Sequence, residues 1–145
     1  FAKRWCRPLA EALGKLGTER AWVVNGSDGL DEITTTGKTW VAEWTGSEVR
    51  EFEISPVDAG LPLATDSDIK GGDPAENAVI LRDILSGVAG PKRDIVVFNA
   101  AAALFVCGKA ESLQAGVALA QRSIDSGAAL KTLDALIALS KEFRP

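Results

Sequence analysis

The chain has 145 residues, of which 46% are hydrophobic, and it carries a formal net charge of −4. This length predicts one ordinary domain, residues 1–145, large enough to bury a core. The acidic balance gives no field that attracts nucleic acid or an anionic membrane, so we expect neither as a partner. Histidine is absent, and the two cysteines stand far apart. A zinc site or a Cys/His or Ser/His/Asp catalytic system cannot be assembled from this chain, and a reducing cytoplasm is the expected location.

The first third of the chain predicts one helix followed by three strands. Residues 2–16 indicate an amphipathic helix with Leu9, Leu13 and Leu16 on one side, and Gly17 is placed to end it. Three short apolar runs then predict strands, namely residues 21–24, 39–43 and 49–54. The last two runs flank a turn of small polar residues and so predict a hairpin. The segment 55–70 is irregular by composition and is expected to be a surface connection.

The second half of the chain predicts mainly helices. Residues 73–76 have the composition of a capping box that starts a helix, which we expect to end near residue 85. The unbroken apolar run 94–98 predicts a strand buried on both faces, as in a parallel sheet, with Asn99 capping a short alanine-rich helix after it. Two further helices carry apolar stripes, with Gly127 between them. These elements together predict an α/β fold with a mixed, largely parallel sheet flanked by helices.

The most informative segment is AWVVNGSDGLDEITTT, residues 21–36, in which an apolar strand leads into a glycine-rich acidic loop. Gly26 and Gly29 allow backbone conformations that are closed to other residues. Three carboxylates of the kind that Mg²⁺ prefers stand in this loop: Asp28, Asp31 and Glu32. Acids without a base repel a bare phosphate, so a phosphate ligand needs a cation between itself and the loop. An isolated acidic pair, by contrast, is more often a solvated turn than a metal site.

Several motifs resemble one enzyme family in their order and spacing. They are VVNGSDGLDEITT, ISPVDAGLP, GGDPAENA and VVFNAAAALFVCGKAESLQAGVALAQRSIDSGAAL. From about residue 8 to residue 139, the chain resembles the C-terminal part of the anthranilate phosphoribosyltransferase family. Its members transfer phosphoribose from phosphoribosyl pyrophosphate (PRPP) to the amine of anthranilate in tryptophan biosynthesis, with Mg²⁺. The resemblance implies the incomplete large domain of a phosphoribosyltransferase of the nucleoside phosphorylase-like type.

The resemblance also implies roles for particular residues. Asp31 and Glu32, the acidic pair of the DGLDE motif, are expected to hold a Mg²⁺ that neutralises the leaving pyrophosphate. The family's pyrophosphate loop and anthranilate-binding residues are expected upstream of this chain, so we assign no catalytic residue and expect the chain alone to be inactive. The full-length protein is expected to be a homodimer through its N-terminal region. Asn25 stands where many relatives carry histidine, and its amide is expected to bridge the loop backbone.

Two alternatives to this transferase remain open. A non-catalytic binding or assembly module of the same fold is compatible with the missing histidine and with Asn25. A pyrimidine nucleoside phosphorylase-type enzyme shares the general architecture. The DGLDE and GGDPAENA motifs follow the anthranilate enzyme more closely, and we therefore expect an anthranilate phosphoribosyltransferase.

Overall fold

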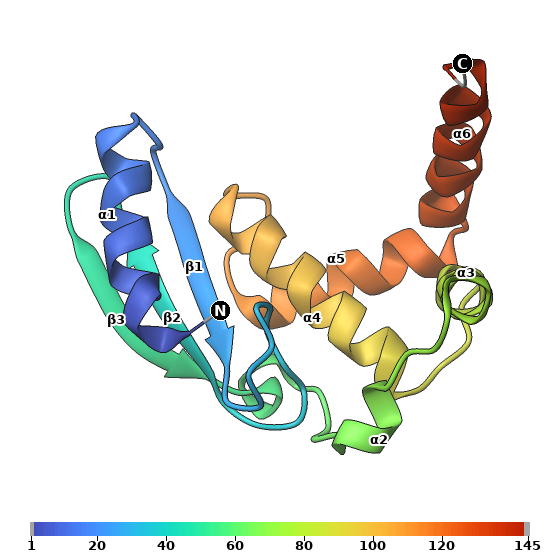
Figure 1. Ribbon diagram of the computed structural model, residues 1–145, viewed down its shortest axis with the longest axis horizontal. Coiled ribbons are helices and arrows are strands. Elements are labelled where there is room, and N and C mark those ends of the chain that lie inside the picture. The colour runs from blue at the N-terminus through green and yellow to red at the C-terminus, as the bar shows by residue number, and fades with distance from the viewer. Residues whose placement is uncertain (1, 144–145) are drawn as a thin grey trace.

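The computed structural model describes residues 2–143, which form a small sheet followed by a group of helices (Figure 1). The first group comprises a 3₁₀ turn (Lys3–Trp5), α1 (Cys6–Lys15), β1 (Ala21–Gly26), β2 (Thr39–Trp44) and β3 (Val49–Ile54). The second comprises a 3₁₀ turn (Pro56–Ala59), α2 (Asp66–Ile69), α3 (Pro74–Leu85), α4 (Pro91–Val106), α5 (Leu113–Asp125) and α6 (Ala128–Glu142). Among these described residues, no helix is both long and apolar enough to cross a bilayer.

The sheet is antiparallel, so the prediction of a mixed, largely parallel sheet is wrong for these residues. Its strands lie in the order β1-β2-β3, and both neighbouring pairs run antiparallel. The predicted hairpin of β2 and β3 is confirmed, with Thr39 opposite Ile54 and Trp44 opposite Val49. β1 pairs with β2 from Ala21 opposite Trp44 onward. The fold is therefore α/β with a three-stranded sheet flanked by helices, as Figure 1 shows.

The predicted strand at residues 94–98 is instead part of α4. Pro91 occupies the first turn of this helix, where its missing N–H costs no hydrogen bond, and Gly90 precedes it with a φ of 141°. The buried positions 97, 98, 101 and 102 recur at helical spacing. A short apolar run without alternation fits a buried helix as well as a buried strand, and here the run is one part of a helix of 16 residues. Asn99 consequently lies inside the helix and does not cap one.

The sheet has a separate core on each face. Successive residues of a strand point to opposite sides, so Ala42 packs against α1 while its neighbour Val41 joins the larger core that contains Phe98 of α4. Figure 1 shows α1 and α4 on opposite sides of the sheet. Trp40 and Trp44 pack on the α1 side. The acidic loop at the end of β1 is thus carried by a strand that is supported from both sides.

Helix α1 packs on the sheet through its small residues and not through its leucines. Cys6 and Ala10 are fully buried, whereas Leu9 and Leu13 are 41% and 36% exposed. A Cβ atom added at Gly14 would stand 2.4 Å from the Trp44 ring, so this position must be small for the helix to approach β2. The predicted helix is therefore confirmed, but its leucine side faces away from the sheet core.

Capping boxes organise the segment before and at the start of α3. Asp73 Oδ1 accepts hydrogen bonds from the N–H groups of Ala75 (2.8 Å) and Glu76 (2.9 Å), and Glu76 Oε2 accepts from the Asp73 N–H at 3.0 Å. The predicted box is confirmed. The segment 55–70, expected to be irregular, holds two further boxes that start the 3₁₀ turn at Pro56 and helix α2. Short polar side chains therefore order a connection that lacks any apolar periodicity.

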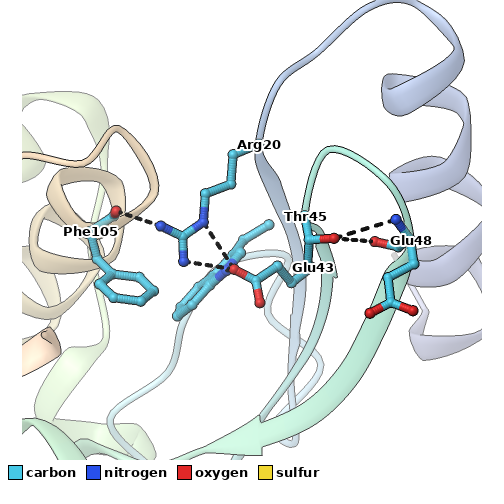
Figure 2. A network of polar contacts seen from close by, with 6 residues as sticks. Arg20, Glu43, Thr45, Glu48 and Phe105 are labelled. Carbon is cyan, nitrogen blue, oxygen red and sulfur yellow. Dashed lines mark hydrogen bonds and ion pairs between the residues drawn. The ribbon is translucent and has the colours of Figure 1, made fainter. Parts of the chain in front are cut away.

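Arg20 forms an ion pair with Glu43 of the sheet and a hydrogen bond to the end of α4 (Figure 2). Arg20 donates to Glu43 Oε1 through Nε (3.0 Å) and Nη2 (2.7 Å), and through Nη1 to the Phe105 carbonyl at 3.2 Å. Trp22 Nε1 donates to the same Glu43 oxygen at 3.0 Å. The Arg20 guanidinium also lies 4.3 Å from the centre of the Phe105 ring. Glu43 is only 9% exposed, so these donors replace the water that its carboxylate loses on burial.

Helices α4 and α5 pack closely against each other at Gly116. A Cβ atom added there would stand 2.7 Å from the Ala101 carbonyl oxygen and 2.9 Å from its Cα. Because helix backbones cannot shift without disturbing the core, we expect Gly116→Ala to lower the free energy of unfolding by about 1–3 kcal/mol. Urea denaturation followed by circular dichroism measures this. Ala118→Ser, on the exposed side of the same helix, is the control, and equal effects of the two changes would contradict the close packing.

Candidate metal-binding loop

The loop between β1 and β2 is closed at its base by the sheet. Gly26 pairs with Thr39 in the strand register, and the Ser27 N–H donates to the Lys38 carbonyl at 2.8 Å. Gly29 has a φ of 93°, in the region that favours glycine. A Cβ atom at Gly26 would lie 2.5 Å from Asp28 Oδ1. The two glycines are therefore needed for the path of the loop, as the sequence indicated.

Asp28 turns inward and holds the loop together. Its Oδ2 accepts hydrogen bonds from the hydroxyls of Thr34 (2.5 Å) and Thr36 (2.7 Å), and its Oδ1 accepts from the Leu30 N–H at 3.1 Å. Desolvation opposes the ionised form, but these hydrogen bonds outweigh it and lower the pKa of Asp28 from its ordinary value. Of the three acids in the loop, Asp28 therefore acts as an internal acceptor.

Leu30 is fixed through both of its backbone groups. Its N–H binds Asp28, and its carbonyl accepts from the Gly26 N–H at 2.9 Å and from Asn25 Nδ2 at 3.2 Å. The expected bridging of the loop backbone by the Asn25 amide is thus confirmed. The side chain of Asn25 at the end of β1 thus gives the Leu30 carbonyl a second hydrogen-bond donor.

Ile33 is fixed in the same way by a side chain from α4. Asn99 Oδ1 accepts from the Ile33 N–H at 3.0 Å, and Asn99 Nδ2 donates to the Ile33 carbonyl at 2.7 Å and to the Ile95 carbonyl at 2.9 Å. Ile33 itself is 2% exposed and belongs to the larger core. The sequence prediction missed this contact, and the only signal for it was a lone amide inside an apolar run.

Asp31 and Glu32 lie between these two fixed residues. Both side chains are exposed, and none of the loop hydrogen bonds given above uses them. Two neighbouring carboxylates suit Mg²⁺, which commonly takes one or two carboxylates and completes its shell with water and substrate phosphates. The described residues hold no group of three or more His, Cys, Asp or Glu side chains that could form a closed metal cage. The donor set therefore fits an open Mg²⁺ site that a phosphate ligand completes.

A family model described as "Glycosyl transferase family, a/b domain" matches residues 1–130. The chain belongs to this glycosyl transferase family. Among curated relatives, the anthranilate phosphoribosyltransferase of Rhodospirillum rubrum is 63% identical over 139 residues, which are 96% of this chain and 40% of that protein. The enzyme of the same name from Parvibaculum lavamentivorans is 56% identical over 138 residues, 95% of this chain and 40% of that protein. The chain thus spans about 40% of the length of the relatives it matches.

Two solved structures share the fold of this chain. The anthranilate phosphoribosyltransferase of Thermus thermophilus superposes with a TM-score of 0.86 at 39% identity, over 95% of this chain and 40% of that one. The Saccharomyces cerevisiae enzyme, solved in complex with PRPP and Mg, superposes with a TM-score of 0.84 at 30% identity, over 92% of this chain and 39% of that one. The resemblance found in the sequence motifs is therefore confirmed.

Proposed function

We propose that this chain is the C-terminal part of a longer anthranilate phosphoribosyltransferase of tryptophan biosynthesis, which transfers phosphoribose from PRPP to the amine of anthranilate. The observation that carries the proposal is the 63% identity to the Rhodospirillum rubrum relative of that name, extending over 96% of this chain. A yeast structural neighbour with PRPP and Mg bound supports the donor and the ion. We place the protein in the nucleoside phosphorylase-like class and in the cytoplasm, as a homodimer formed through a region outside this chain, with neither nucleic acid nor membrane as a partner.

Asp31 and Glu32 are the residues that would hold Mg²⁺. When bound, the ion supplies positive charge that stabilises the pyrophosphate as it leaves the ribose carbon. The two carboxylates, exposed at the end of β1, contribute by placing that charge and not by transferring a proton. Asp28 does not join them, because its oxygens already accept hydrogen bonds from Thr34, Thr36 and Leu30. No catalytic acid or base within this chain is part of the proposal.

A chimera tests this function. In the Rhodospirillum rubrum relative, the matched 139 residues are replaced by this chain, and pyrophosphate release is measured with PRPP, anthranilate and Mg²⁺. We expect activity within about tenfold of the unmodified relative, because a high identity preserves the contacts between the two parts. The isolated 145-residue chain is expected to release no pyrophosphate above background.

Three results would contradict the proposal. A chimera that folds, as judged by circular dichroism and size-exclusion chromatography, but is inactive would favour the non-catalytic module. Phosphorolysis of pyrimidine nucleosides by the chimera, in place of anthranilate-dependent turnover, would favour a nucleoside phosphorylase. Activity of the isolated chain would show that no residue outside it is required.

A further inference from the structure

We propose that Asn99 is a positioning residue for the metal-binding pair, acting through the backbone of the loop. The proposal rests on the proposed function, because it assigns Asn99 a role at the Mg²⁺ site of Asp31 and Glu32. Asn99 comes from the middle of α4 and reaches the loop across 66 positions of sequence. Through its side chain, α4 is hydrogen-bonded to the backbone of one loop residue, Ile33.

The polar groups of the Asn99 amide are occupied within the protein. Oδ1 accepts from the Ile33 N–H, and Nδ2 donates to the carbonyls of Ile33 and Ile95. An asparagine amide has two N–H hydrogens, and both are used here. The side chain therefore has no free donor with which to contact a phosphate or a sugar. Its effect on a bound ligand must pass through the position of Ile33.

The pair lies between two residues whose backbone groups are both hydrogen-bonded. On one side, Leu30 donates to Asp28 and accepts from Gly26 and Asn25. On the other side, Ile33 donates to and accepts from Asn99. The short stretch between them consists of Asp31 and Glu32. The backbone that carries the two carboxylates is therefore fixed at both ends. Removing the Asn99 amide frees the end nearer Glu32.

A fixed carboxylate pair binds a metal more tightly than a mobile one. Partners that orient ligands from outside the coordination shell typically contribute 10–100-fold to metal affinity or activity. If the loop end at Ile33 is released, the protein must order Glu32 again each time the ion binds. We therefore expect the loss of the Asn99 amide to weaken metal binding without changing the recognition of the acceptor.

The test compares Asn99→Ala with Asn77→Ala in the full-length protein. Asn77 makes the same pattern of bonds elsewhere, since its Oδ1 accepts from the Gly72 N–H and its Nδ2 donates to the Gly72 carbonyl, both at 2.9 Å. Mn²⁺ alone is titrated, and the bound fraction is read by electron paramagnetic resonance. We expect Asn99→Ala to weaken Mn²⁺ binding about 10–100-fold and Asn77→Ala to leave it unchanged. In kinetics, the Mg²⁺ concentration for half-maximal rate should rise in Asn99→Ala, while the KM for anthranilate stays the same.

Asn99→Asp is a second test of the positioning role if Asn99→Ala does not fold. The aspartate has the same shape and keeps the acceptor for the Ile33 N–H, but it loses both donors and places an oxygen against the Ile33 and Ile95 carbonyls. We therefore expect a loss of Mn²⁺ affinity at least as large as in Asn99→Ala. Wild-type affinity in a folded Asn99→Ala or Asn99→Asp protein, or an equal loss in Asn77→Ala, would overturn the positioning role. If Asp31→Asn with Glu32→Gln also binds Mn²⁺ as the wild type does, the metal site itself is wrong and the role of Asn99 is overturned with it.

Discussion

Neutralising the acidic pair, as Asp31→Asn with Glu32→Gln, is expected to lower kcat/KM for PRPP in the full-length protein by about 100-fold or more. Removing one preorganised group that stabilises developing charge commonly costs about 10²–10³ in rate, and this change removes both carboxylates that are proposed to hold the ion. If the pair holds the ion as proposed, the ion is left with only PRPP and water as ligands in this variant, so saturation with Mg²⁺ should need a higher concentration. Initial rates measured over a matrix of Mg²⁺ and PRPP concentrations test this.

A second neutralised pair separates a local effect from the change in net charge. Glu51→Gln with Glu53→Gln also removes two negative charges, in this case from β3, where the carboxylates form exposed ion pairs with Arg7 and Lys38. We expect this variant to keep the Mg²⁺ dependence of the wild type. Both double variants should unfold at nearly the same temperature as the wild type, because all four side chains lie outside the core. A Mg²⁺ dependence that is unchanged in Asp31→Asn with Glu32→Gln would refute the metal assignment.

Replacing Arg20 by methionine is expected to lower the free energy of unfolding by about 2–3 kcal/mol. Breaking a buried ion pair from one side typically costs about 3–5 kcal/mol, and the value is reduced here because the Arg20 side chain is 35% exposed. The change leaves Glu43 with Trp22 as its remaining donor among the contacts described above. It also removes the hydrogen bond to the Phe105 carbonyl, which joins the sheet to α4. Urea denaturation of the full-length protein, with tryptophan fluorescence as the probe, measures the loss.

Arg50→Met is the matched control for this change. Arg50 pairs with Glu48 on the surface, where the two side chains are 66% and 58% exposed. Exposed pairs of this kind add little to stability because water screens them. We therefore expect only a small effect. Equal destabilisation by the two arginine variants would show that burial of Glu43 is not what gives the Arg20 contact its strength.

Local patterns in the sequence were sufficient to predict much of the architecture. The capping box at Asp73 and the hairpin of β2 and β3 depend on residues close together in sequence, and the structure confirms both. The Asn25 amide also binds within its own loop. Each of these features is determined by side-chain chemistry within a few residues, which is why propensity and spacing could identify it.

The errors arose where a local pattern fits two structures, or where contacts between distant segments decide the outcome. Residues 95–98 within the run are all apolar, and such a short stretch does not distinguish a buried strand from a buried helix; the preceding Pro91 and the alanines that follow favour the helix. Without that strand, the described part of the sheet is antiparallel. The contact of Asn99 with Ile33 had no local signature, because it forms only when α4 packs beside the loop. The sequence therefore indicated which carboxylates could bind a metal, but not what holds them in place.

Calorimetric titration of the full-length protein with PRPP, in the presence and absence of Mg²⁺, tests the central claim most directly. If Asp31 and Glu32 hold the ion that accompanies the pyrophosphate, Mg²⁺ should strengthen PRPP binding to the wild type. Most of that strengthening should be lost in Asp31→Asn with Glu32→Gln. The same gain in PRPP affinity from Mg²⁺ in both proteins would contradict the account.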